Sequence, residues 1–172
     1  VEAVLLGNQV EPIVSEAYRY GAKRVYLIDD PVLSIYRNKP YAWGISRLVE
    51  KYKPEIFLVG ATILGRDLAG SIATQIRTGL TADCTELAID PDKKILAATR
   101  PTFGGNLMAT ILCLKRRPQM ATVRPRVLPM PQPLPHANGE LIRESLDLTE
   151  EDVPVKLKRF IPSTEQLNIE YA

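Results

Sequence analysis

The chain has 172 residues, of which 45% are hydrophobic, and a formal net charge of +2. A chain of this length can bury a core of its own without a disulfide or a metal, and its two cysteines and one histidine have none of the spacings typical of metal ligands. It contains no apolar run near the roughly 20 residues that a membrane span needs. These properties predict a globular domain of a reducing, cytoplasmic compartment, and they disfavour a metalloprotein or a membrane protein.

The first half of the sequence alternates short apolar strands with amphipathic helices. In chain order we expect a strand at Ala3–Leu6, a helix from Pro12 to Gly21, a strand at Arg24–Ile28, a helix with its apolar face between Tyr41 and Tyr52, a strand at Ile56–Val59, and a helix that begins near Arg66 or Asp67 and ends at Gly79. The strands are rich in β-branched apolar residues, which is typical of strands buried on both faces of a parallel sheet. The alternation predicts right-handed crossovers.

The second half contains strand patterns without helices between them. We expect strands at Glu86–Ile89, Lys94–Ala98, Leu107–Leu114, Met120–Val123 and Leu141–Leu146, and a short helix capped by Thr149. Six prolines from Pro118 to Pro135 predict that residues 127–138 form an extended surface segment. The predicted fold is therefore a three-layer, doubly wound α/β fold, with a mainly parallel sheet and an antiparallel edge or meander in its second half.

A long basic sector lies in this second half. Between Lys93 and Gly139 there are eight lysine or arginine residues and no acidic residue, so a net charge of −6 remains for the rest of the chain. Phe103 is the only Phe, Tyr or Trp of the sector, which disfavours nucleic acid and favours an acidic protein surface or a phosphate-bearing cofactor. We expect its proline-rich part, from Lys115 to Pro135, to pack on a partner protein.

The segment Gly60–Asp67 almost matches a phosphate-binding P-loop, but Arg66 and Asp67 occupy the positions of the required lysine and of the serine or threonine. Without that lysine nothing clamps a γ-phosphate, so the pattern excludes an ATPase. Two interpretations remain. In the first, Gly60 and Gly65 form a tight turn, and Asp67 caps the following helix or pairs with Arg66. In the second, the turn contacts a nucleotide or a partner protein.

Neither cysteine has the surroundings of a nucleophile. Cys84 follows Asp83, whose charge would raise the pKa of the thiol, and His136 is too distant in the sequence to suggest a base. Cys113 lies in an apolar strand pattern. We expect both cysteines to be small buried residues, and we expect no catalytic residue in this chain.

An arginine and two glycines follow the strand predicted at Lys94–Ala98. Arg100 precedes Gly104 and Gly105, which permit the backbone to approach a flat or charged group. The segment is either a hairpin turn with a surface arginine or a face that meets a cofactor or a partner subunit, a role to which the planar charge of arginine is suited. Arg124 has the same two interpretations.

Four sequence blocks occur in the order and at the separations found in one known family. These blocks are Gly60–Asp67, Thr78–Cys84, Thr99–Asn106 and Arg117–Pro125. On these blocks the chain resembles, from about Val1 to Asp152, the amino-terminal domain of the electron transfer flavoprotein alpha subunit. Four ordered blocks are more specific than any single glycine pattern.

The resemblance implies an electron carrier component rather than an enzyme. Members of this family are alpha/beta heterodimers that receive electrons from acyl-CoA or other dehydrogenases, and their FAD lies mostly in the carboxy-terminal domain of the alpha subunit. In a eukaryote the compartment would be the mitochondrial matrix. The residues that the resemblance leads us to expect near the cofactor or the partner subunit are Arg66, Arg100, Gly104, Gly105 and Arg124.

The chain departs from the family pattern in three respects. It lacks the strand and helix that normally precede Val1, it stops at Ala172 before the flavin domain, and Arg126 replaces a usual glycine, although arginine tolerates positive φ less well. We therefore expect residues 1–152 to form the family domain and 153–172 to be a linker toward a missing flavin domain. The alternative function is a stand-alone adenine-nucleotide-binding regulatory domain of the related stress-protein type, but the sequence lacks the phosphate-binding glycine cluster that would favour it.

Overall fold

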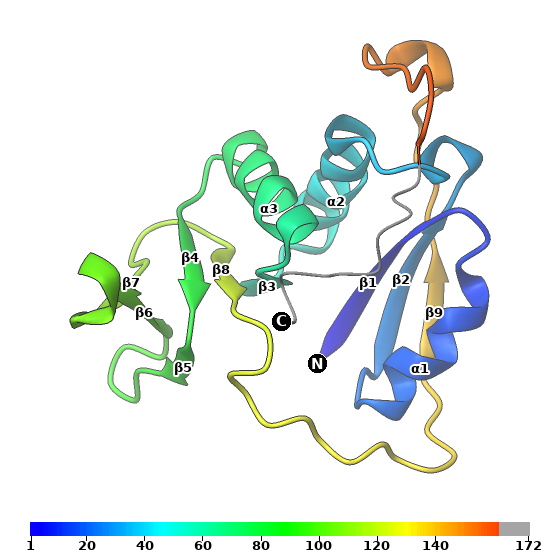
Figure 1. The fold of residues 1–172 in the computed structure, drawn as a ribbon. Helices are drawn as coiled ribbons and strands as arrows, with labels where there is room; N and C mark the ends of the chain where they lie inside the picture. The colour runs from blue at the N-terminus through cyan, green and yellow to red at the C-terminus, as the bar shows by residue number, and fades with distance from the viewer. Residues whose placement is uncertain (162–172) are drawn as a thin grey trace.

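The computed structural model describes residues 1–161. Two strands from the beginning of this range and one strand from near its end form a three-stranded parallel sheet. β2 (Arg24–Asp29) lies between β1 (Glu2–Gly7) and β9 (Glu140–Arg143) and pairs in parallel with both (Figure 1). The strand predicted at Leu141–Leu146 is therefore present with different bounds. Its partner is a strand from the beginning of the chain.

Alternate side chains of this sheet face two different helices. Val25 and Leu27 pack in a cluster with residues of α1 (Val14–Arg19), whereas Tyr26 packs with residues of α2 (Asn38–Tyr52). Successive side chains of a strand point to opposite faces, so apolar groups cover both faces of the sheet. The predicted arrangement of helices on both sides of a parallel sheet is confirmed.

A second three-stranded parallel sheet packs against α2 and α3 (Ile63–Gln75), which lie side by side (Figure 1). In this sheet β8 (Gln119–Val123) lies between β3 (Ile56–Gly60) and β4 (Leu80–Cys84). Apolar residues of these strands, of β1 and of both helices form one core cluster around the fully buried Ile72. The parallel strands thus form two sheets that share one helix layer, rather than the single sheet that the sequence predicts.

In the second half of the chain one predicted strand pairs differently from the expectation, and one strand is not predicted. The strand at Met120–Val123 does not belong to a meander, because β8 is the central strand of a parallel sheet. Leu80–Cys84 is a strand that we do not predict at all. An apolar run such as that of β8 has the same composition in parallel and antiparallel sheets, so only its partners, which come from other parts of the chain, reveal its direction.

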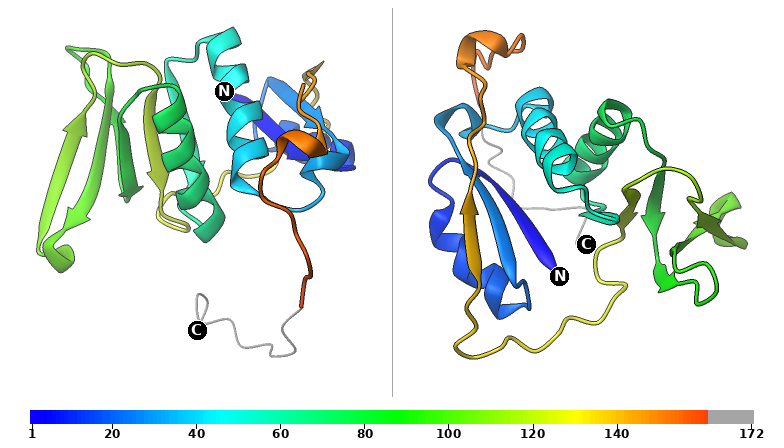
Figure 2. Two further views of the ribbon diagram at one scale, coloured as in Figure 1. Left: turned by 90° about the horizontal axis from the view of Figure 1, so that it is seen from above. Right: turned by 180° about the vertical axis from the view of Figure 1, so that it is seen from behind.

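An antiparallel sheet of three strands is present where the sequence predicts an antiparallel edge. It contains β5 (Glu86–Ile89), β6 (Leu96–Thr102) and β7 (Leu107–Leu112) in that order. β6 packs on the second parallel sheet, where Ala98 shares a buried cluster with Cys84. Figure 2 shows that this sheet lies at the opposite end of the molecule from α1.

The third helix begins at Ile63, earlier than the start predicted near Arg66 or Asp67, because Thr62 caps it. The hydroxyl of Thr62 accepts a hydrogen bond from the backbone N–H of Gly65 at 3.0 Å. A Cβ added to Gly65 would lie 1.9 Å from the carbonyl oxygen of Gly60. The tight turn between these two glycines is therefore confirmed, and it requires glycine at its second position.

Left-handed residues follow the first two helices. Gly21, with a φ of +96°, follows α1 as predicted, and Lys53, with a φ of +48°, ends α2 just before Pro54. Short 3-10 turns occur at Glu11–Ile13, Pro31–Leu33, Phe103–Gly105 and Glu150–Asp152. The last of these has the predicted Thr149 as its N-cap.

The proline-rich segment runs across the molecule from β8 to β9 (Figure 1). Residues 127–138 contain neither helix nor strand and are mostly exposed, as predicted. Just before them Arg126 adopts a φ of +64°. An arginine therefore occupies a backbone conformation that favours glycine, which is the residue that the resemblance leads us to expect here.

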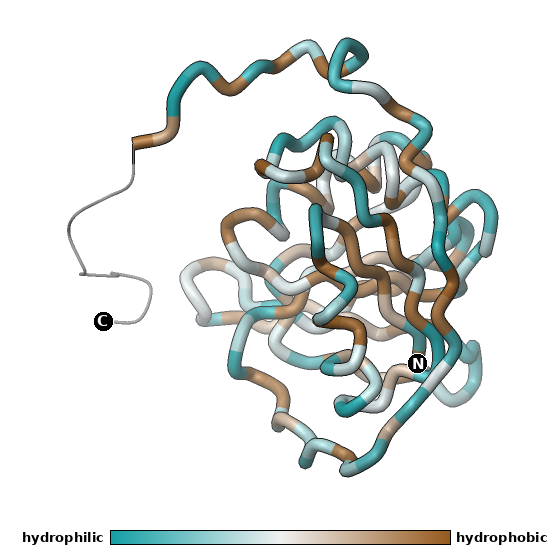
Figure 3. The backbone as a smooth tube through the Cα atoms, turned by 90° about the vertical axis from the view of Figure 1, so that its right-hand side faces the viewer, coloured by the Kyte–Doolittle hydropathy of each residue, from teal (hydrophilic) through white to brown (hydrophobic). Residues whose placement is uncertain are grey.

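After the turn at Glu150–Asp152 the chain leaves the body of the molecule as an extended segment (Figure 3). Several of its apolar side chains, such as Val155 and Phe160, are exposed. Residues 162–172 of the predicted linker lie outside the described part of the chain. Within residues 1–161, no helix combines the length and the apolar character that crossing a bilayer requires.

Candidate functional site

The carboxyl ends of the second parallel sheet bring an aspartate and an arginine together. Asp83 lies near the end of β4 and Arg124 directly follows β8; the guanidinium donates to both carboxylate oxygens, at 3.1 Å from Nε to Oδ1 and 2.6 Å from Nη2 to Oδ2. The backbone N–H of Arg124 donates to the carbonyl of Cys84 at 2.9 Å. The N–H of Asp83 donates to the hydroxyl of the buried Thr122 at 2.8 Å. These contacts hold the ion pair in one orientation.

Two further arginines act on this pair. The charges of Arg66 and Arg100 both favour the ionised form of Asp83. Arg66 lies in the first turns of α3, and its Nε donates to the carbonyl of Ala61 at 2.8 Å. The Nε of Arg100 is shielded from solvent and has no hydrogen-bond partner among the described residues. We call Arg66, Arg100, Arg124 and Asp83 the arginine cluster.

The ion pair shifts the pKa of both its members, Asp83 and Arg124. Hydrogen bonds from Arg124 lower the pKa of the Asp83 carboxyl by more than burial raises it. In turn, the hydrogen bonds to Asp83 raise the pKa of Arg124. Because a single carboxylate stands against three guanidiniums, positive charge remains in excess. The cluster is therefore suited to contact a further anionic group, either a carboxylate or a phosphate.

Replacing the aspartate should expose its contribution to stability. Asp83→Asn should lower the free energy of unfolding at neutral pH by about 1 kcal/mol, a small value because the two side chains are 27% and 45% exposed and solvent screens them. Asparagine suits the φ of +60° at this position, so the backbone should not change.

The pH dependence of this effect follows from the lowered pKa. A carboxyl with a lowered folded pKa stabilises the fold above its unfolded pKa and loses that contribution as the pH falls through the folded value. The difference in urea midpoint between wild type and Asp83→Asn should therefore be constant down to about pH 5 and shrink below about pH 4. A difference that persists unchanged at about pH 2 would contradict this role.

The two predicted glycines lie at the tip of the β6–β7 hairpin. Gly104 has a φ of +69° and Gly105 a φ of +94°, in the left-handed region that glycine adopts at low cost. Both lie beyond Arg100 in the chain, and no described contact joins them to the arginine cluster. Of the five predicted site residues, the three arginines lie near enough to Asp83 for their charges to favour its ionised form, whereas the two glycines lie in the turn at Phe103–Gly105.

Asp67 neither caps α3 nor pairs with Arg66, in contrast to the prediction. Its carboxylate accepts hydrogen bonds from the hydroxyl of Tyr36 at 2.6 Å and from the side-chain amide of Asn38 at 2.7 Å. These bonds lower the pKa of Asp67, and they connect the start of α2 to α3. The two partners lie about thirty residues away in the chain, so no local pattern indicates them.

The two cysteines differ from each other. Cys84 is fully buried, as predicted, and burial raises the pKa of its thiol. The prediction for Cys113 is wrong: this residue is only partly buried, because β7 ends at Leu112 and the thiol lies beyond the strand, 3.5 Å from the carbonyl oxygen of Arg116. Among residues 1–161 no three His, Cys, Asp or Glu side chains are grouped so that they could hold a metal ion.

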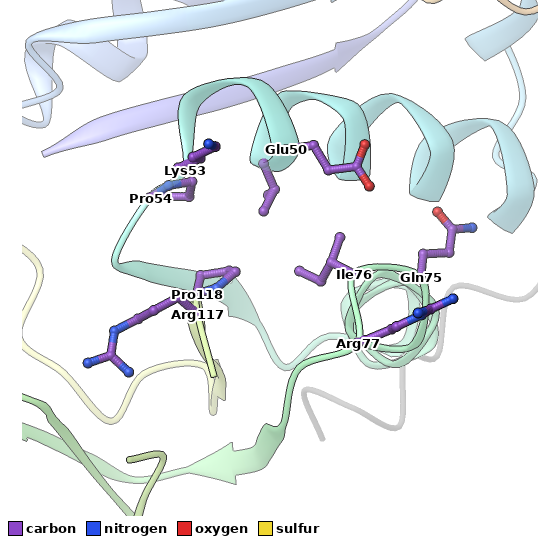
Figure 4. A pocket seen from close by; sticks show the side chains of 9 residues that line it. Glu50, Lys53, Pro54, Gln75, Ile76, Arg77, Arg117 and Pro118 are labelled. Atoms are coloured by element: carbon purple, nitrogen blue, oxygen red, sulfur yellow. The ribbon is translucent and has the colours of Figure 1, made fainter. Parts of the chain in front are cut away.

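A pocket of about 590 Å³ lies between the carboxyl-terminal ends of α2 and α3 (Figure 4). Val49 and Ile76 are among its apolar lining residues. Arg117 also belongs to the lining, but its guanidinium points away and donates to Glu55 at 2.7 Å. Lys53 and Arg117 lie just before β3 and β8, so the pocket is at the amino-terminal ends of these strands. The arginine cluster lies at their carboxyl ends. The pocket contains none of the predicted site residues.

The described residues are suited to contact part of a flavin cofactor, but they are not suited to enclose it. The arginine cluster has excess positive charge and, in the Nε of Arg100, a donor without a described partner. These groups suit a phosphate, an anionic flavin edge or a partner carboxylate. However, the glycine turn before α3 is closed by the contact between Gly60 and Gly65, and the pocket of Figure 4 lies at the other edge of the sheet.

Comparisons with known proteins confirm the resemblance. Residues 1–149 match the family described as Electron transfer flavoprotein domain. Protein FixB of Azorhizobium caulinodans is 50% identical, over 99% of this chain and 47% of its own length. Protein FixB of Rhizobium meliloti is 51% identical over 96% of this chain and 47% of its own length. Electron transfer flavoprotein subunit alpha of Megasphaera elsdenii is 46% identical over 94% of this chain and 48% of its own length. The chain spans about half the length of these relatives.

Proposed function

Because this chain belongs to the electron transfer flavoprotein family, we propose that it is the scaffold domain of an alpha subunit. In this proposal the subunit works in an alpha/beta heterodimer that passes electrons from dehydrogenases through FAD. The observation that carries the proposal is the 46% identity, over 94% of the chain, to a protein named electron transfer flavoprotein subunit alpha. It favours an electron carrier over the nucleotide-binding regulatory alternative.

FAD, when bound in the heterodimer, would supply the redox chemistry. The chain itself contributes a rigid support and a fixed electric field. The support is the pair of parallel sheets with their shared helices, and the field comes from the arginine cluster at the carboxyl ends of β3, β4 and β8, the edge at which doubly wound folds place ligands. Fixed positive charge at such an edge favours anionic groups that approach it.

Arg100 is the member of the cluster best suited to meet the cofactor or the partner subunit. Arg124 is engaged with Asp83 through two hydrogen bonds. Arg66 uses its Nε to bind the carbonyl of Ala61. Arg100 makes no described side-chain hydrogen bond or ion pair, and the residue is only partly buried although its Nε is shielded. The rest of its guanidinium can therefore donate to an acceptor from outside this chain.

Assembly of the heterodimer tests the proposal. Residues 1–172 would replace the matching half of Azorhizobium caulinodans FixB, and the chimera would be co-expressed with a beta subunit of the family. We expect a complex of one alpha and one beta subunit that retains flavin absorbance through gel filtration, whereas the 172-residue chain alone should retain little or none. A chimera that forms no complex while the parent FixB does, or a chain that retains stoichiometric flavin alone, would overturn the proposal.

The same heterodimer measures the role of Arg100. Arg100→Ala should lower the flavin reduction potential by about 40 mV, which corresponds to about 1 kcal/mol for one electron, because loss of a fixed positive charge disfavours anionic reduced states. The melting temperature should change by less than about 2 °C. Arg19→Ala on α1 removes the same charge at a distant place and is the control. If Arg100→Ala lowers the melting temperature and leaves the potential unchanged, Arg100 is structural.

A further inference from the structure

β7 is an edge strand that lacks the usual protection of a sheet edge. It is the outermost strand of the antiparallel sheet, and its six residues, from Leu107 to Leu112, include no charged residue, no proline and no glycine. Natural edge strands are usually interrupted or charged, because an open apolar edge pairs readily with another chain. The other edge of the same sheet, β5, has such features: it begins with Glu86 and is followed by Asp90 and a proline.

The register of the sheet identifies the open backbone groups of β7. Thr99 in β6 directs its carbonyl toward the β5 side, since it accepts the N–H of Thr85 at 2.9 Å. The next residue, Arg100, therefore directs its backbone groups toward β7, where it lies opposite Ala109. By the alternation of an antiparallel ladder, the backbone N–H and C=O groups that point away from β6 are those of Met108, Thr110 and Leu112.

Apolar side chains accompany this open backbone. Leu107 is 59% exposed and Met108 is 56% exposed, Ile111 is also exposed, and Phe103 at the hairpin tip is 81% exposed. In Figure 2 the hairpin lies at the end of the molecule, away from the helices. Exposed apolar groups gathered beside unpaired backbone are typical of surfaces that bind another protein.

The charge around β7 indicates the kind of partner. β7 lies within the sector from Lys93 to Gly139, which contains eight basic and no acidic residues, and Lys115 and Arg116 follow it closely. Carboxylates on the partner would complement this sector. A second copy of this chain would not, because self-pairing of one edge brings the same surface to both sides of the interface.

We propose that β7 pairs with an extended segment of the beta subunit, which contributes apolar side chains to the pairing and carboxylates at its flanks. This inference rests on the proposed function, because it names the surface through which the heterodimer forms. The added strand extends the β5–β6–β7 sheet and bonds to the backbone of Met108, Thr110 and Leu112.

Amide hydrogen exchange on the chimeric heterodimer tests the pairing directly. In the free 172-residue chain the amides of Leu107, Ala109 and Ile111, which face β6, should exchange more slowly than those of the three open residues. In the heterodimer the amides of Met108, Thr110 and Leu112 should become protected, with exchange at least about tenfold slower. Unchanged exchange of all three in a heterodimer that does form would overturn the inference.

A proline substitution supplies a second, independent measurement. Met108→Pro removes one outward N–H and places a ring in the path of an approaching strand, while Met108 lies opposite Pro101 and so no ladder bond to β6 is lost. It should weaken binding of the beta subunit by at least about tenfold. The matched control is Ile89→Pro on β5, whose N–H also points out of the same sheet and which is also exposed; it should change affinity by less than about twofold.

The outcomes separate this inference from the proposed function. If the wild-type chimera binds the beta subunit and Met108→Pro binds equally well, the heterodimer stands and the docking edge is wrong. If Met108→Pro and Ile89→Pro weaken binding equally, the effect comes from the fold of the sheet, and the docking edge is again wrong. If the wild-type chimera binds no beta subunit, the proposed function and this inference are both overturned. If the heterodimer forms but β7 pairs with a second copy of this chain, only this inference is overturned.

Discussion

Gly65→Ala should destabilise the chain by about 3 kcal/mol or more, a large part of the 5–15 kcal/mol that stabilises a typical domain. The added Cβ would lie 1.9 Å from the carbonyl oxygen of Gly60 and 3.1 Å from the hydroxyl of Thr62. The backbone carbonyl cannot move without shifting the end of β3, and the hydroxyl is the N-cap of α3. Urea denaturation followed by circular dichroism would measure the loss as a lower midpoint.

Gly70→Ala is the matched control, because Gly70 lies in the same helix. A Cβ at Gly70 would meet no atom within 4 Å, and alanine favours the helix by about 0.5–1 kcal/mol over glycine. The two substitutions should therefore have opposite signs. If Gly65→Ala were as stable as wild type, the close approach of the turn to the helix would not exist in solution, and the position of Arg66 would have to be reconsidered.

Gly105→Val should destabilise the chain by about 1–3 kcal/mol and distort the β6–β7 hairpin. Gly105 has a φ of +94°, which a β-branched residue adopts only with strain. No atom lies within 4 Å of an added Cβ, so the loss would come from the backbone alone. Thermal denaturation of the isolated chain should show a melting temperature lower by about 2–10 °C.

Two further variants separate backbone strain from the size of the side chain. Gly105→Asn should cost clearly less than Gly105→Val, because asparagine enters positive φ more readily. Gly60→Val adds the same side chain at a glycine without positive φ and without near neighbours, and it should change stability by less than about 1 kcal/mol. Equal losses for Gly105→Val and Gly105→Asn would show that φ at this position is not the cause.

Much of the first half of the fold could be predicted because each element has its own local signal. β1, β2 and β3 are short apolar runs, and residues such as Val25 and Tyr26 alternate between two covered faces. Gly21 ends the first helix with a left-handed φ. Such signals depend on neighbours within one or two turns of the chain, which the sequence contains in full.

The candidate site could be predicted in its members but not in its organisation. The sequence places Arg66, Arg100 and Arg124 each beside a turn, but it indicates no role for Asp83 beyond its effect on Cys84. In the structure Asp83 binds Arg124, and the charges of the other two arginines favour its ionised form. The ion pair spans 41 positions of the chain. This contact exists because β4 and β8 are neighbours in a parallel sheet, and the sequence offers no local pattern for that pairing.

The sequence by itself determined the class of the fold, the tight glycine turn before α3, the burial of Cys84 and, through four ordered blocks, the family. Each depends on residue type or on spacings along the chain. Only the tertiary structure decided the pairing of β8 between β3 and β4, the partners of Asp67, the gathering of the arginine cluster and the open edge of β7. These features require segments far apart in the chain to meet, and many pairings are compatible with the same local preferences; the one that forms is selected by the burial and hydrogen bonding of the whole domain.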